Sequence, residues 1–173
     1  MTSSRGEHAP TIAAVPSHER LLLQAIAIGR EARAHGNHPF GALLADQDGR
    51  VLLTAENTVV TNSDATGHAE TNLVRQATTA YSAAELATMT LYSSTEPCAM
   101  CAGAIYWSGI GAVAYALSET TLYELTGEDP ENPTLVLPCR TVFGAGRRPI
   151  TVAGPFDLEE AREVHAGFWR PEG

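Results

Sequence analysis

Lysine is absent from this sequence of 173 residues, and its 11 basic side chains, all arginine, stand against 20 acidic ones. The formal net charge is therefore -9. Proteins that bind nucleic acid broadly use Lys and Arg to neutralise phosphates, and an acidic surface repels a polyphosphate backbone. The composition excludes a broadly cationic nucleic-acid binder and favours a small neutral ligand as the partner.

Long apolar runs are also absent. The longest, Leu21 to Ile28, is interrupted by Gln24, and it is much shorter than the roughly 18 to 20 apolar residues that cross a bilayer. The first residues, MTSSRGEHAP, contain no apolar segment of the kind found in secretory signal peptides. We therefore expect no membrane partner and a cytoplasmic location.

Cysteine is scarce, with three residues in the chain. An odd and sparse count provides no disulfide framework, and in a reducing compartment it indicates metal or redox chemistry. The apolar fraction of 44% is typical of a globular domain, and a chain of this length buries enough surface for its own core. The sequence predicts a flexible N-terminal tail over residues 1–16 and a single domain over residues 17–173.

The spacing of apolar residues predicts helices that alternate with strands. The first helix follows a candidate N-cap at Ser17 and ends near His35. Further helices are predicted over 67–79, 98–107, 118–125 and 158–169. Strands are predicted over 41–46, 51–55, 89–93, 112–116 and 149–153, and irregular loops over 57–67 and 126–138. A tight turn joins the first two strands, so the pattern predicts an α/β fold, a three-layer α/β/α sandwich with a five-stranded mixed sheet.

Two short motifs carry the chemistry, His68-Ala69-Glu70 and Pro97-Cys98-Ala99-Met100-Cys101. Cysteines at i and i+3 at the start of a helix share a face, and the helix N-terminus lowers the pKa of their thiols. With His68 as a third ligand, the fourth tetrahedral position of a zinc ion stays open, as in catalytic sites. Glu70 can then move a proton from zinc-activated water to a leaving amine without binding the metal.

Other interpretations of these cysteines are possible. A lone Cys-x-x-Cys is also found in redox pairs and in structural zinc sites, but the matching His-x-Glu favours an open zinc site. Cys139 could close the site as a fourth ligand. It has no second cysteine at zinc-knuckle spacing, so a buried apolar thiol is the favoured interpretation.

The motifs resemble those of the cytidine deaminase superfamily, whose zinc-dependent members carry H-x-E and P-C-x-x-C. The resemblance runs from about His38 to Trp169 and is closest to the guanine deaminase and nucleoside deaminase branch. It is carried by the segments His38 to Ala42, Asn57, Thr66 to Thr71 and Ser94 to Trp107. It implies a cytidine deaminase-like fold and a homodimer or larger assembly. It also implies one zinc ion per chain on His68, Cys98 and Cys101, with Glu70 as catalytic acid and base.

The same resemblance implies a set of substrate-binding residues. They are Asn57, Phe40, Gly41, Ala42, the backbone of Ala69, Asp129 beside Glu128, and three aromatic residues that could stack on a base, Trp107, Phe168 and Trp169. An Asn side chain suits a base edge because it offers both a donor and an acceptor. Asn57 could equally cap its own loop, Trp107 could contact another subunit, and the two C-terminal aromatics could pack the last helix on the sheet.

The sequence therefore predicts a zinc-dependent hydrolytic deaminase of a free purine base or nucleoside, guanine-like before adenine-like, that releases ammonia. A cytosine- or cytidine-type pyrimidine deaminase is the alternative on the same machinery. A tRNA adenosine deaminase shares the zinc residues, but the acidic charge disfavours it. Outside enzymology, a structural zinc module with four ligands could bind a protein partner. The choice between base and nucleoside stays open at this point.

Overall fold

The computed structural model describes residues 18–127, 129–130, 132–133 and 135–169. The tail predicted over residues 1–16, the candidate N-cap Ser17 and Glu128 lie outside the described residues. The strands are β1 (Gly41–Ala45), β2 (Val51–Glu56), β3 (Thr90–Thr95), β4 (Ala112–Leu117) and β5 (Thr151–Ala153). The helices are α1 (His18–Ala34), α2 (Val59–Asn62), α3 (Ala69–Ala80), α4 (Ala83–Leu86), α5 (Ala99–Ser108), α6 (Glu119–Thr126), α7 (Cys139–Gly144) and α8 (Glu159–Glu163).

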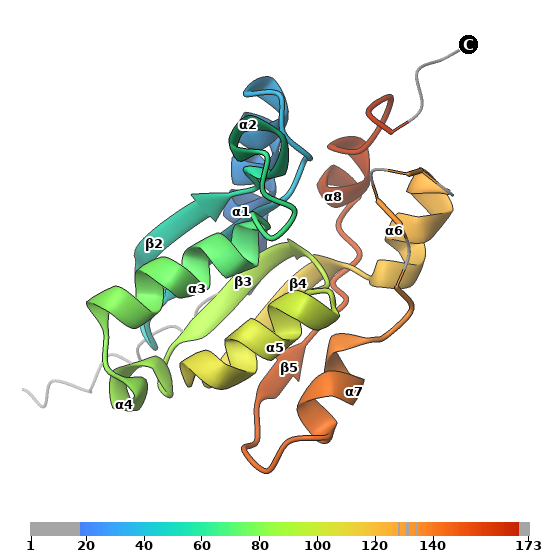
Figure 1. The fold of residues 1–173 in the computed structure, drawn as a ribbon. Coiled ribbons are helices and arrows are strands. Elements are labelled where there is room, and N and C mark those ends of the chain that lie inside the picture. Colours follow the sequence, from blue (N-terminus) through green and yellow to red (C-terminus); the bar gives the residue numbers. More distant parts are fainter. Residues whose placement is uncertain (1–17, 128, 131, 134, 170–173) are drawn as a thin grey trace, which may run out of the picture.

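The strands form one mixed sheet in the order β2-β1-β3-β4-β5 (Figure 1). β1 is antiparallel to both β2 and β3, whereas β3 and β4, and then β4 and β5, run parallel. The parallel pairing places the carboxyl ends of β3 and β4 at the same edge of the sheet, where ligand sites of α/β folds form. The predicted α/β fold with a five-stranded mixed sheet is confirmed.

Helices cover both faces of this sheet. α3 and α5 lie side by side on one face (Figure 1), and their Leu73 and Ile105 belong to a core that also includes Leu91 of β3. The predicted apolar stripe of α1 is buried against the other face, where Leu22 and Ile26 pack with strand and α8 residues. Each helix therefore contributes one apolar face to a core on its own side of the sheet.

Gly41 allows α1 to pack directly on β1. A Cβ atom at this position would lie 2.3 Å from the carbonyl oxygen of Ala25 and 2.5 Å from the backbone nitrogen of Gly29. Any side chain would therefore push the helix off the strand. The glycine thus sets the distance between the helix layer and the sheet.

The structure departs from the predicted elements in the connecting segments. The loop predicted over 57–67 contains the single turn of α2, and the short helices α4 and α7 were not predicted. The closing helix predicted over 158–169 ends as α8 at Glu163, and the chain continues in turns that include Gly167 at φ 64°. Within the described ranges, no helix is both long enough and apolar enough to span a membrane.

Candidate active site

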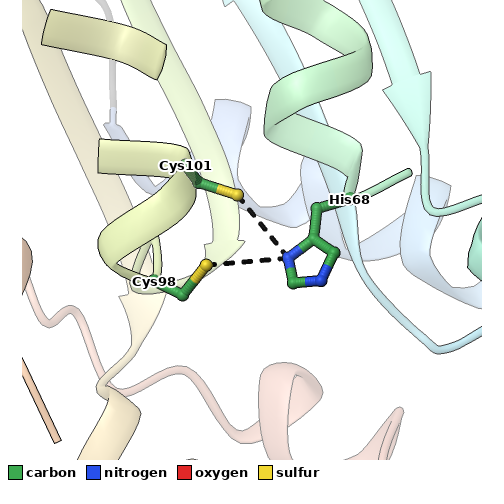
Figure 2. A group of neighbouring side chains, drawn as sticks. All are labelled: His68, Cys98 and Cys101. Atoms are coloured by element: carbon green, nitrogen blue, oxygen red, sulfur yellow. Dashed lines mark hydrogen bonds between the residues drawn. The ribbon is translucent and has the colours of Figure 1, made fainter. Parts of the chain in front are cut away.

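Three metal-binding side chains meet where α3 and α5 begin. His68 is the N-cap of α3 and Cys98 is the N-cap of α5, while Cys101 lies in the first turn of α5. Their side chains converge, with Nδ1 of His68 facing both sulfur atoms (Figure 2). The three ligand atoms lie within 4.8 Å of one another. The packing of α3 beside α5 therefore assembles, from residues 30 positions apart in sequence, the cluster that the two motifs predict.

The distances within this cluster suit a tetrahedral zinc ion. Nδ1 of His68 is 3.7 Å from Sγ of Cys98 and 3.6 Å from Sγ of Cys101. Zinc bonds of about 2.3 Å to sulfur and about 2.0–2.1 Å to nitrogen, at tetrahedral angles, require a sulfur–nitrogen separation of about 3.6 Å. Two cysteines and one histidine also form a donor set typical of catalytic zinc. The residues present fit the metal and leave one coordination position for a non-protein ligand.

The two thiols differ in acidity. A hydrogen bond donated by the Cys101 thiol lowers the pKa of Cys98 to about 4, against the opposing effect of burial and with help from His68. The same hydrogen bond, together with burial, raises the pKa of Cys101 well above its ordinary value. Cys98 is therefore held as a thiolate at neutral pH, which is the form that binds metal.

Glu70 lies in the first turn of α3 and is only 6% exposed. Its Oε1 accepts a hydrogen bond from the Ser93 hydroxyl at 3.0 Å, and its Oε2 lies 3.5 Å from Sγ of Cys101. Burial, followed by the negative charge of Cys98, raises the pKa of Glu70. A carboxyl group with a raised pKa beside a metal site is better able to accept a proton and return it than an ordinary carboxylate is.

A cavity of about 40 Å³ opens beside this cluster. Its walls are formed by Phe40, His68, Glu70, Thr95, Glu96, Cys98, Glu119, Leu122 and Asn132. Larger depressions elsewhere on the surface, of about 570 and 420 Å³, contain none of the predicted zinc ligands and do not include Glu70. The chemistry therefore lies in the smaller cavity.

Of the two roles that the sequence left open for Asn57, the structure shows the local hydrogen bond, and the substrate-binding role stays a prediction. Asn57 is completely buried, and its Oδ1 accepts a hydrogen bond from the backbone N–H of Val59 at 3.0 Å, which caps α2. Its Nδ2 is buried without a hydrogen-bond partner in the described part of the chain. A buried donor without a partner costs free energy, so this amide is a candidate to donate to a bound ligand.

The other predicted substrate-binding residues divide into two groups. Phe40 lines the cavity, and Ala69 is the first residue of α3, where the backbone N–H has no partner within the helix. Gly41 instead contacts α1, and Ala42 belongs to the apolar core. Asp129 is half-buried and is not part of the cavity wall, although Asn132, three residues further on, is.

The predicted aromatic cover is also divided. Trp107 is 85% exposed on α5 and does not line the cavity. Trp169 is 5% exposed and packs against Phe40, with ring centroids 5.8 Å apart, and Phe168 packs edge-on against Trp169. The C-terminal aromatics therefore support the Phe40 wall from behind and do not face the cavity.

Sequence reasoning missed two acidic residues of the cavity, Glu96 and Glu119. Glu96 joins three elements, because its carboxylate accepts the backbone N–H of Glu119 at 3.1 Å and that of Cys139 at 3.0 Å. Burial, with the charges of Cys98 and Glu96, raises the pKa of Glu119 to about 7. The available signal was topological, since Glu119 lies two residues after the end of β4, whose carboxyl end lies beside that of β3.

Comparisons with known proteins agree with this site. The sequence pattern of the cytidine and deoxycytidylate deaminase zinc-binding region matches residues 15–117. A probable cytosine deaminase from Schizosaccharomyces pombe is 43% identical over 148 residues, which cover 86% of this chain and 90% of the relative. A guanine deaminase from Bacillus subtilis is 39% identical over 114 residues, covering 65% of this chain and 72% of the relative.

The fold has solved counterparts as well. A tRNA:A34 deaminase structure superimposes with a TM-score of 0.64 at 26% identity, covering 84% of this chain and 99% of the other. The matched pattern includes both metal-binding motifs, and the S. pombe relative extends the similarity over most of the chain. The chain therefore belongs to the cytidine and deoxycytidylate deaminase family of zinc-binding proteins.

Proposed function

We propose that this protein is a zinc-dependent hydrolase that removes the exocyclic amino group of a nucleobase or nucleoside and releases it as ammonia. The observation that carries the proposal is the position of the buried Glu70 carboxylate in the same cavity as His68 and Cys98. Among the residues that the structure describes, the cluster provides three ligands and no fourth, which suits catalysis better than a purely structural role.

The residues of the chain have distinct roles in this reaction. When bound, zinc would supply Lewis acidity that activates a water molecule. Glu70 accepts one proton of that water as the water oxygen bonds to the amidine carbon, and passes it to the ring nitrogen. Glu70 then moves the remaining hydroxyl proton to the amine, so that ammonia leaves as the carbon–nitrogen bond breaks and the carbon–oxygen bond becomes a carbonyl. The Ser93 hydroxyl fixes Oε1 of Glu70, while the second oxygen stays on the cysteine side of the site.

Two rings are candidate substrates, and we place cytosine before guanine. The sequence alone favoured a guanine-like ring, but the relative named as a probable cytosine deaminase matches this chain at higher identity and over more of its length than the guanine deaminase does. Guanine is the second candidate because of that B. subtilis relative. The buried Nδ2 of Asn57 supports either ring, since both present an acceptor beside the amidine.

The proposal includes no nucleic acid substrate. Related tRNA deaminases share the fold, but no arginine lines the cavity in the described part of the chain, and the chain carries a net charge of -9. A cytoplasmic location and a homodimer are also proposed. Met100 and Trp107 lie two turns apart on α5 and are exposed, so they form an apolar face that a second copy could cover.

An ammonia-release panel tests the proposal. It covers guanine, guanosine, 2'-deoxyguanosine, adenine, adenosine, cytosine and cytidine with the zinc-loaded protein. Glu70→Gln should retain zinc and lower kcat by about a hundredfold or more, because general acid–base groups contribute about 10²–10⁴. Glu124→Gln, an exposed position on α6 outside the cavity, is the matched control. Near-normal turnover by Glu70→Gln would contradict the assigned role.

A further inference from the structure

Glu119 stands where two cavities meet. It is the first residue of α6 and lines the active-site cavity together with His68 and Glu70. It also lines an adjoining cleft of about 40 Å³ between α6 and residues 136–138. Its side chain is therefore next to both the position of the reacting ring and the space beyond it.

Among the described residues, none donates a hydrogen bond to the carboxylate of Glu119 or forms an ion pair with it. The carboxylates of the other two glutamates in the cavity, Glu70 and Glu96, do accept hydrogen bonds. Glu96 accepts two backbone N–H groups, and Glu70 accepts the Ser93 hydroxyl. Glu119 is half-buried. A partly desolvated carboxylate on a cavity wall is stabilised when a ligand brings it an N–H or O–H donor.

The adjoining cleft suits apolar groups. Besides Glu119 and Thr120, its walls are the side chains of Tyr123, Val136, Leu137 and Pro138. A ribose that extended from the ring into this cleft would place hydroxyl groups against these apolar walls. Hydroxyls that lose water without gaining partners cost free energy, so the cleft disfavours a sugar.

These observations favour one of the two substrate classes left open above. We infer that Glu119 accepts a hydrogen bond from the ring N–H that a free base retains and a nucleoside has replaced by its glycosidic bond, so that the enzyme selects free bases. The inference rests on the proposed deaminase function and specifies its substrate class. Glu119 is then a specificity-determining residue, because the amino group that leaves is handled by Glu70.

The test compares three ligands that differ at a single nitrogen, namely cytosine, 1-methylcytosine and cytidine, with guanine, 9-methylguanine and guanosine as a parallel set. The wild-type protein should prefer each free base over its N-methyl analogue and its nucleoside by about 10–100-fold in kcat/KM. Glu119→Leu should reduce kcat/KM for the free base by a similar factor, mainly through KM, and should leave the N-methyl analogue unchanged. Glu119→Gln keeps an acceptor and should fall between the two.

Binding is measured separately from turnover. Calorimetric titration of zinc-loaded Glu70→Gln, with and without Glu119→Leu, should show that the second substitution weakens binding of the free base alone. Glu124→Gln controls for loss of one charge from α6, and zinc content and thermal unfolding confirm that each variant is folded.

The outcomes separate this inference from the deaminase proposal. Equal kcat/KM for base and nucleoside, or a Glu119→Leu variant that loses nucleoside activity selectively, would overturn the inference and would instead indicate that Glu119 binds the ribose diol. Equal affinity of the two titrated proteins for the free base would overturn it as well. Discrimination in binding without any ammonia release would leave the inference standing and refute the deaminase proposal.

Discussion

His165 is a buried ionisable residue outside the reacting cavity. Its Nδ1 accepts a hydrogen bond from Nε1–H of Trp169 at 3.0 Å, so the proton of the neutral ring is on Nε2. Nε2 is buried without a hydrogen-bond partner in the described ranges. Burial, followed by the positive charge of Arg33, lowers the pKa of His165 to about 4. The ring therefore stays neutral in the folded protein where it would be protonated in the unfolded chain.

This difference predicts acid sensitivity. Below about pH 6.5 the His165 side chain binds a proton in the unfolded chain but not in the folded protein. Its contribution to the free energy of unfolding is therefore complete above that pH and is lost as the pH falls from about 6.5 to about 4. The loss amounts to about 3 kcal/mol at most. Urea unfolding at several pH values should show a shallower pH dependence for His165→Gln, which keeps an acceptor for Trp169. An unchanged pH dependence in that variant would contradict the burial argument.

Single residues differ in how far the sequence could predict them. His68, Glu70, Cys98 and Cys101 belong to two short motifs whose spacing alone indicates a zinc site, and the structure brings the three ligands together. Glu119 is 18 residues beyond Cys101 and gains its place through strand pairing. Its position depends on tertiary structure, so a local motif could not identify it.

α5 is held at its C-terminal end by a contact from outside the helix. Cys98 is its N-cap, and its C-cap is Gly109, which has the positive φ of 93° that favours glycine at a helix C-terminus. The Arg148 guanidinium donates to the carbonyl oxygens of Tyr106 at 2.6 Å and Ile110 at 2.8 Å. These charged hydrogen bonds satisfy carbonyl oxygens at the C-terminal end of α5, opposite the end that carries the two cysteines.

Removing this contact should destabilise the fold. Arg148→Met is expected to lower the free energy of unfolding by about 1.5–3 kcal/mol, the usual range for hydrogen bonds to charged groups. Arg147→Met is the matched control, because Arg147 is adjacent to Arg148 in sequence and is exposed. The two variants are compared by urea denaturation. If their midpoints coincide, Arg148 does not hold the end of α5.

Whole elements were predicted best where their own residues determine them. α1, α3 and α5 have periodic apolar faces and were predicted to within a few residues of their bounds. α7 was missed because its short sequence, CRTVFG, has little helical propensity. Its start is fixed by Glu96, which accepts the backbone N–H of Cys139. α8 is shorter than predicted because the hydrogen bonds after Glu163 become those of tight turns, in which His165 N–H donates to Arg162 and Ala166 N–H donates to Glu163.

The molecule as a whole brings the two metal-binding motifs together. Parallel pairing of β3 and β4 places α5 next to α3, so His68 meets the two cysteines at the shared edge of the sheet. A zinc ion at this point would link two helices that are separated in sequence by β3. Glu70 and Glu119 lie at the same edge and line one cavity. The proposed proton transfer and the proposed selection of free bases therefore take place in the same cavity.

Elemental analysis of the purified protein tests this account most directly. We expect one zinc ion per chain in the wild-type protein and in Glu70→Gln. We expect a large loss of zinc in Cys101→Ser, because Cys101 supplies one of the three ligand atoms. A wild-type protein that contains no zinc after loading, or a Cys101→Ser variant that retains a full equivalent at that site, would contradict it.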